Sequence, residues 1–159
     1  MADGLPPDID DDSIPGTELL YRRVRADMVF EVSPGKYKLA SGALKENRWP
    51  LSVDLSSLAN PEHTRDWDKS SPFHVASFSA KEAREVECRI VRDPLKEVGD
   101  KQANPAHALL FGNAKNGNGA LAYKSQSRKI AKGAAIVLLN RLAPPPKQLE
   151  NEPDDGPEA

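Results

Sequence analysis

The chain has 159 residues, which is enough for one domain with a hydrophobic core and too short for two ordinary domains. Hydrophobic residues make up 38% of it, the formal net charge is -2, and no run of about 18 apolar residues occurs, so the composition excludes a membrane-spanning helix. The N-terminus lacks the basic start and apolar run of a secretory signal, and Cys88 is the only cysteine, so no internal disulfide forms. We therefore expect a soluble protein of the cytoplasm.

Both ends of the chain are acidic and contain proline. Residues 1–13 carry five aspartates and no basic residue, and residues 144–159 carry five acidic side chains and one lysine. Neither stretch can bury enough apolar surface to offset the entropy of ordering, so both are predicted to be disordered tails. Residues 14–143 hold 21 basic and 14 acidic side chains, a net charge of +7. This basic core suits a polyanionic partner, although ordinary solubility charge would give the same count.

The first half of the chain is predicted to be rich in short strands. Runs of aromatic and β-branched residues, and the alternation in LSVDL, indicate strands at 19–24, 28–32, 36–41 and 51–55. The sequence SPGK at Ser33 to Lys36 predicts a turn that makes the second and third strands a hairpin. Asn60 as a cap and Pro61 at the first helical position predict a short helix that ends near Lys69.

A strand, helix, strand unit follows. HVASF predicts a strand at 74–78, and Ser79 with Glu82 forms a capping box for a short helix through about Val86. CRIV predicts a strand at 88–91 that stops before Pro94. Two further elements are expected after it: a strand at about 107–111 and a longer helix within 125–142, where Ile130, Ala134, Val137, Leu138 and Leu142 recur at helical spacing.

These elements predict a single α+β domain over residues 14–143. It would contain a mixed, mainly antiparallel sheet of about five to seven short strands, two short helices, and one longer C-terminal helix packed on the sheet.

His107 is the leading candidate for acid or base chemistry. It follows Asn104 and Pro105 at the entry to an apolar strand, where a turn can present an imidazole to a substrate. The alternative is a structural histidine that caps a turn carbonyl. Ser41, in a glycine-containing bend, is a second catalytic candidate, because a serine, an arginine and a histidine from separate strands can line one cleft.

Arg22 and Arg23 are candidate anion ligands in the segment YRRVR. Alternation along a strand puts Arg23 on one face with Tyr21, and Arg22 on the other face with Leu20 and Val24. An arginine that points into an apolar face needs a partner, so Arg22 is either a member of a buried ion pair or a phosphate ligand.

The glycine-rich loop GNAKNGNG, residues 112–119, is a second candidate anion site. It lacks the GK[ST] ending of a phosphate-binding Walker loop. Backbone N–H groups in such a loop can still cradle an anion, with help from nearby basic side chains: Lys115, Lys124, Arg128 and Lys129. A plain flexible connection explains the same composition.

No metal or cofactor site is predicted. His63, His74 and His107 show no i, i+4 spacing, and the chain has no HExxH motif. Cys88 alternates with Val86 and Ile90, which indicates a small buried hydrophobic residue of a strand and not a nucleophile.

Three functions remain open. The first is a binding module whose basic core engages a nucleic acid, a nucleotide or an acidic protein. The second is a small enzyme that acts on a nucleotide or another phosphate-bearing substrate, with His107 as general acid or base and Arg22 or Arg23 holding the anion. The third is an immunity or adaptor subunit of a small operon that docks onto another chain. The first two would be separated by whether Arg22 or Arg23, Ser41 and His107 line one pocket.

Overall fold

The computed structural model of the protein describes residues 10–44, 51–67, 73–100, 102–112, 123–140 and 147–148. Within these ranges the strands are β1 (Leu19–Arg25), β2 (Val29–Ser33), β3 (Lys36–Leu39), β4 (Leu51–Leu55), β5 (Phe73–Ser79), β6 (Arg89–Arg92), β7 (His107–Phe111), β8 (Ala135–Leu138) and β9 (Lys147–Gln148). The α-helices are α1 (Pro61–Asp66), α2 (Ala80–Glu85) and α3 (Tyr123–Gly133). One turn of 3-10 helix, Ala26–Met28, joins β1 to β2.

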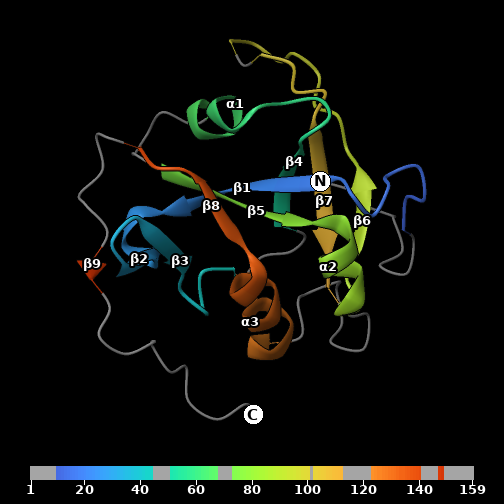
Figure 1. Cartoon of the computed structure of the whole chain (residues 1–159). Helices are drawn as coiled ribbons and strands as arrows, with labels where there is room; N and C mark the ends of the chain where they lie inside the picture. The colour runs from blue at the N-terminus through green and yellow to red at the C-terminus, as the bar shows by residue number, and fades with distance from the viewer. Residues whose placement is uncertain are drawn as a thin grey trace.

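The strands form two sheets (Figure 1). Six of them are hydrogen-bonded in the order β6-β7-β4-β1-β5-β8, and every neighbouring pair in this sheet is antiparallel. A smaller sheet has the order β3-β2-β9, with β9 parallel to β2. The predicted class, α+β with a mixed and mainly antiparallel sheet, is therefore confirmed, and each of the seven predicted strands is present.

One face of the six-stranded sheet carries the main core. Leu20 on β1 lies directly opposite Leu55 on β4 and Phe78 on β5, so these three side chains share a face. They belong to one buried cluster with Ala83 of α2 and Ile130 of α3, which places both helices on this side. α1 lies on the other side of the sheet (Figure 1), where the Thr64 hydroxyl donates a hydrogen bond to Asp54 of β4.

Both short helices begin where the sequence predicts. The Asn60 side chain accepts a hydrogen bond from the backbone N–H of His63, and Pro61 occupies the first helical position of α1. Ser79 and Glu82 form the predicted capping box at the start of α2. Each cap satisfies backbone donors that a helix start leaves without an intrahelical partner.

The prediction of one helix within 125–142 is wrong in its second half. α3 ends at Gly133, and residues 135–138 form β8, which pairs with β5 at the edge of the sheet. A Cβ atom at Gly133 would lie 2.7 Å from a carboxylate oxygen of Glu82, so glycine permits this close approach to α2. The run AIVL is compatible with either element, and pairing with β5 decides in favour of a strand.

Residues 10–13, which belong to the predicted N-terminal tail, contact β6. The backbone N–H of Asp11 donates to the Ile90 carbonyl, and the Ile90 N–H donates to the Asp10 carboxylate, at 2.8 and 2.9 Å. Arg84 forms an ion pair with Asp10 at 3.0 Å. A hydrogen bond from Ser13 holds the pKa of Asp11 below its ordinary value. This segment thereby covers the Ile90 backbone groups of a strand that ends the sheet.

Cys88 is buried in the main core, as predicted for a small hydrophobic residue. Burial raises the pKa of its thiol to about 12, so the thiol is protonated at neutral pH. Among the helices of the described residues, none has the length and apolar content needed to cross a membrane.

His74 on β5 is a buried histidine, with 1% of its surface exposed. Its Nδ1 accepts a hydrogen bond from the backbone N–H of Asn140 at 2.9 Å, so the neutral ring carries its proton on Nε2. Burial lowers the pKa of His74 from the ordinary value of 6.5. The charged ring would lose both its hydration and the bond to Asn140.

The free energy of unfolding should therefore decrease as the pH falls below 6.5. In that range the unfolded chain binds a proton at His74 that the folded chain does not, which costs up to about 1.4 kcal/mol of stability per pH unit until the lowered pKa is reached. His74→Gln keeps an acceptor for Asn140 but does not titrate, so its stability should depend less steeply on pH. Urea unfolding of both proteins between pH 7.5 and pH 5 measures this, and equal slopes would contradict the assignment.

Candidate functional site

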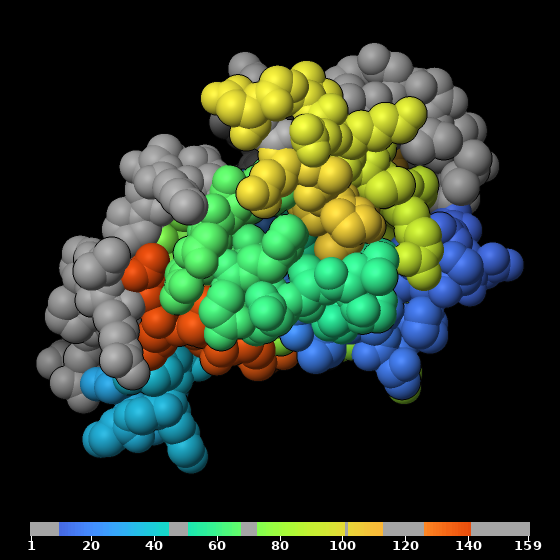
Figure 2. Space-filling view, turned by 90° about the horizontal axis from the view of Figure 1, so that it is seen from above, coloured from blue at the N-terminus to red at the C-terminus, as the bar shows by residue number. Residues whose placement is uncertain are grey.

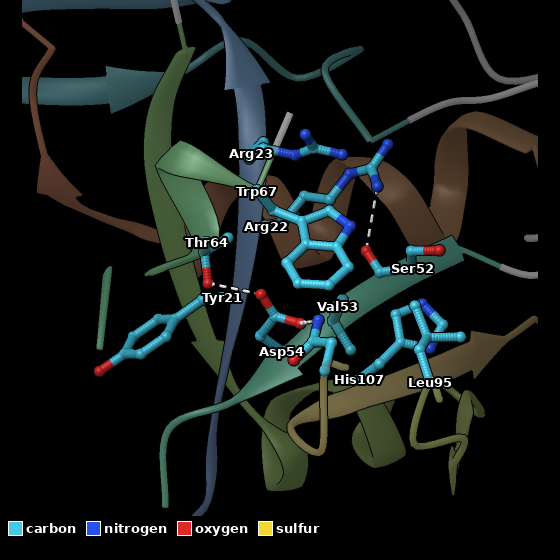
Figure 3. A pocket seen from close by; sticks show the side chains of 11 residues that line it. Tyr21, Arg22, Arg23, Ser52, Val53, Asp54, Thr64, Trp67, Leu95 and His107 are labelled. Carbon is cyan, nitrogen blue, oxygen red and sulfur yellow. Dashed lines mark hydrogen bonds between the residues drawn. The ribbon is translucent and has the colours of Figure 1, made fainter. Parts of the chain in front are cut away.

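A cavity of about 150 Å³ lies between α1 and the second face of the six-stranded sheet. Figure 3 shows the side chains that surround it. They come from β1, β4, β7, α1 and the segment between β6 and β7: Tyr21, Arg22, Arg23, Ser52, Val53, Asp54, Thr64, Trp67, Leu95, Asn104 and His107.

The floor of the cavity consists of two rows of side chains. Tyr21, Asp54 and His107 lie side by side on β1, β4 and β7, because Asp54 is the registered partner of both other residues. Arg23 and Ser52 lie two residues farther along β1 and β4. They therefore face the same way, about 7 Å from the first row. One row holds a carboxylate and an imidazole, and the other brings a guanidinium group.

Arg22 lines the cavity although it follows the last residue of β1 that is paired with β4. The two strands are registered at Leu20 with Leu55 and at Tyr21 with Asp54. Past this point the Arg22 side chain extends to β4, where its Nη1 donates a hydrogen bond of 3.0 Å to the Ser52 carbonyl (Figure 3). The Arg22 guanidinium, which is always positively charged, also lines the cavity.

Arg23 packs on an aromatic ring from the neighbouring strand. Its guanidinium carbon lies 5.1 Å from the centre of the Phe73 ring, a cation–π contact that orients the side chain. Because Arg22 and Arg23 both line the cavity, an anion bound there would contact two guanidinium groups.

Asp54 is a buried carboxylate at the centre of the floor. Its Oδ2 accepts a hydrogen bond from the Thr64 hydroxyl at 2.7 Å, and its Oδ1 accepts one from the Asn104 amide at 2.9 Å. These bonds tie β4 to α1 and to the segment before β7. The side chain is only 6% exposed, although it borders the cavity.

His107 is oriented by Asp93. Its Nδ1 lies 2.9 Å from the Asp93 carbonyl oxygen and 3.2 Å from the Asp93 carboxylate. Both are acceptors, so Nδ1 carries the proton and Nε2 carries the lone pair in the neutral ring. The backbone N–H of Asp93 donates to the His107 carbonyl, which fixes the two residues relative to each other. An imidazole held in this way can accept a proton at Nε2.

The walls are formed by α1 and by the segment 95–104. Leu95 and Asn104 exchange two backbone hydrogen bonds, which close this segment into a loop. His63 Nε2 lies 3.0 Å from the Asn104 side-chain oxygen, and its ring lies 5.6 Å from that of Trp67. Figure 2 looks onto this side of the molecule and shows α1, in green, beside the yellow loop.

The structure brings together three of the candidate site residues. Arg22, Arg23 and His107 line the same cavity. Ser41 does not: it lies in the turn after β3, and its hydroxyl is buried without a hydrogen-bond partner among the described residues. The proposed cleft of serine, arginine and histidine is therefore incomplete, because the hairpin that carries Ser41 belongs to the second sheet.

The predicted glycine-rich anion site cannot be placed with this cavity. Lys115 and the side chain of Lys124 lie outside the described residues. Arg128 and Lys129 are on α3, which packs on the opposite face of the sheet, and neither lines the cavity.

Sequence reasoning missed Asp54, Thr64, Trp67 and Asn104 as site residues. Alternation in LSVDL did place Ser52 and Asp54 on one face of a strand, and that was the available signal. It could not show that β7 would bring His107 beside Asp54, or that α1 would cover this face. In the described part of the chain, no group of three or more His, Cys, Asp or Glu side chains is arranged to hold a metal ion.

No family model, curated protein or solved structure matches the chain.

Proposed function

We propose that the protein is a small enzyme that acts on a phosphate-bearing small molecule, with Arg22 and Arg23 as anion ligands and His107 as general acid or base. The observation that carries the proposal is that these three residues, from β1 and β7, line one cavity. Guanidinium groups bind phosphate through charge-assisted hydrogen bonds. A neutral imidazole next to them can move a proton on the same bound molecule.

The spacing of the two rows supports this division of roles. A phosphate at the arginine side places the rest of the ligand over Asp54 and His107, one strand repeat of about 7 Å away. His107 Nε2 would then accept a proton from a hydroxyl group of the substrate or from water, and the resulting imidazolium would return it in a later step. The Asp93 carbonyl and carboxylate stabilise the ring in the required tautomer.

The proposal is tested by a turnover screen with nucleotides and sugar phosphates, followed by phosphorus NMR. Arg23→Met keeps much of the side-chain length but removes the cation. It should weaken binding of the active phosphate compound by about 10- to 100-fold, since a hydrogen bond to a charged group contributes about 1.5–3 kcal/mol.

Lys129→Met is the matched control, because it removes one exposed cation from α3, on the opposite side of the sheet. It should leave binding unchanged. Equal effects of the two substitutions, or a complete lack of binding and turnover across the screen at low salt, would count against a phosphate site in this cavity.

A second candidate is a binding module for a polyanion, favoured by the net charge of +7 over residues 14–143. Exposed Lys129 and Lys132 on α3 add positive charge away from the cavity. Binding to DNA or RNA through phosphates should weaken steeply as salt increases. Gel-shift experiments at 50 and 200 mM salt would measure this. No shift at low salt would exclude a nucleic-acid partner of this kind.

A further inference from the structure

The carboxyl group of Asp54 adds a hydrogen-bond acceptor to a cavity that two arginines also line. Both groups that bond to it, the Thr64 hydroxyl and the Asn104 amide, are neutral. Within the part of the chain that the structure describes, no ion pair includes Asp54. Because its two partners are neutral, the Asp54 carboxyl group can accept hydrogen bonds from a donor of the ligand without first breaking an ion pair.

Asp54 has hydrogen-bonding capacity left. A carboxylate offers about four lone-pair positions, and each of its two oxygens here accepts one hydrogen bond, so about two positions remain. Figure 3 shows the two arginine side chains on one side of the Trp67 ring, and Asp54 on the other. A ligand that spans the cavity therefore meets donors at one end and an acceptor at the other.

We propose that the ligand is a phosphate ester that also carries hydrogen-bond donors, namely a sugar phosphate or a nucleotide, and that Asp54 accepts hydrogen bonds from its hydroxyl or amino groups. This inference rests on the proposed function, because it takes Arg22 and Arg23 as the phosphate end. The cavity volume of about 150 Å³ accommodates one six-membered ring, which suits a sugar or a base. Inorganic phosphate held at the arginine row would lie about 7 Å from the Asp54 row, too far for its own hydroxyl groups to donate to Asp54.

The selectivity can be measured by titrating the full chain with inorganic phosphate, ribose 5-phosphate, glucose 6-phosphate and AMP at constant ionic strength. The indole N–H resonance of Trp67, which lines the cavity, reports binding. At least one of the three esters should bind about 10-fold or more tightly than inorganic phosphate, as expected when hydrogen bonds form to a charged acceptor.

Asp54→Asn should remove most of this preference and leave the affinity for inorganic phosphate unchanged or increased. Glu62→Gln is the matched control, since it removes an exposed carboxylate of α1 that does not line the cavity, and it should retain the preference. If Asp54→Asn does not fold, the ligand can be changed instead: 2-deoxyribose 5-phosphate lacks one donor and should bind the wild-type protein less tightly than ribose 5-phosphate.

The outcomes separate this inference from the proposed function. If inorganic phosphate binds as tightly as all three esters, and Arg23→Met weakens it, the phosphate site stands and the role of Asp54 is overturned. If the preference for esters survives in Asp54→Asn, the role of Asp54 is likewise overturned. If none of the four phosphate compounds binds, both the inference and the proposed function fail.

Discussion

Replacing His107 by glutamine should lower kcat for the phosphate-bearing substrate by about 10²- to 10⁴-fold, the usual contribution of a positioned general acid or base. Glutamine can still donate a hydrogen bond to the Asp93 carbonyl, so β7 should remain in place. It has no group that accepts and releases a proton near neutral pH. Steady-state kinetics of both proteins, with circular dichroism to confirm folding, measure the effect. Ligand affinity should change much less than kcat, because the arginines that bind the anion are intact.

His63→Gln is the appropriate control for this substitution. His63 is also an imidazole at this side of the molecule, but it bonds to Asn104 and does not line the cavity. Glutamine can replace that hydrogen bond, so kcat should fall only slightly. If both substitutions reduce kcat to the same extent, or if neither does, His107 is a structural histidine that bonds to the Asp93 carbonyl. That result would favour a non-catalytic binding protein.

The fold follows from local patterns to a large extent, and β8 shows where they stop. β1 contains an aromatic and a β-branched residue, and β4 alternates apolar and polar side chains, so both strands could be predicted from local sequence. The run AIVL of β8 carries the same composition, yet its apolar residues also recur at helical spacing with those of α3. Pairing with β5 settles its structure, and β5 lies more than 50 residues earlier in the chain. Pairing between distant strands leaves no pattern in the local sequence from which it could be predicted.

The candidate site was only partly predictable for a related reason. Alternation placed Arg23 and Tyr21 together, and a turn before an apolar strand drew attention to His107. The contact between Asp54 and His107 depends on β4 pairing with β7, which joins residues 53 positions apart. Strand order in a sheet with non-consecutive neighbours cannot be read from the periodicity of single strands. The covering of this face by α1 and the loop 95–104 is determined in the same way, by packing between distant segments.

Truncating Leu20 to alanine should lower the free energy of unfolding by about 2–5 kcal/mol, a large share of the 5–15 kcal/mol typical of a domain. Leu20 has no exposed surface and lies between Leu55 and Phe78 on the core face of the sheet. Its removal leaves a cavity at the centre of the main cluster. Urea unfolding should show a lower midpoint with an unchanged slope, since the surface exposed on unfolding stays the same.

Tyr21→Ala is the matched truncation, because Tyr21 is the next residue of β1 and points to the opposite face, which carries the ligand cavity. Its side chain is only partly buried, so the loss of stability should be clearly smaller than for Leu20. Ligand affinity should fall more for Tyr21→Ala than for Leu20→Ala. Equal losses of stability would mean that both faces of β1 stabilise the fold to the same degree. The expected contrast would instead assign folding stability to the face packed on α2 and α3, and leave the face under α1 to bind charged and polar groups that a core could not accommodate.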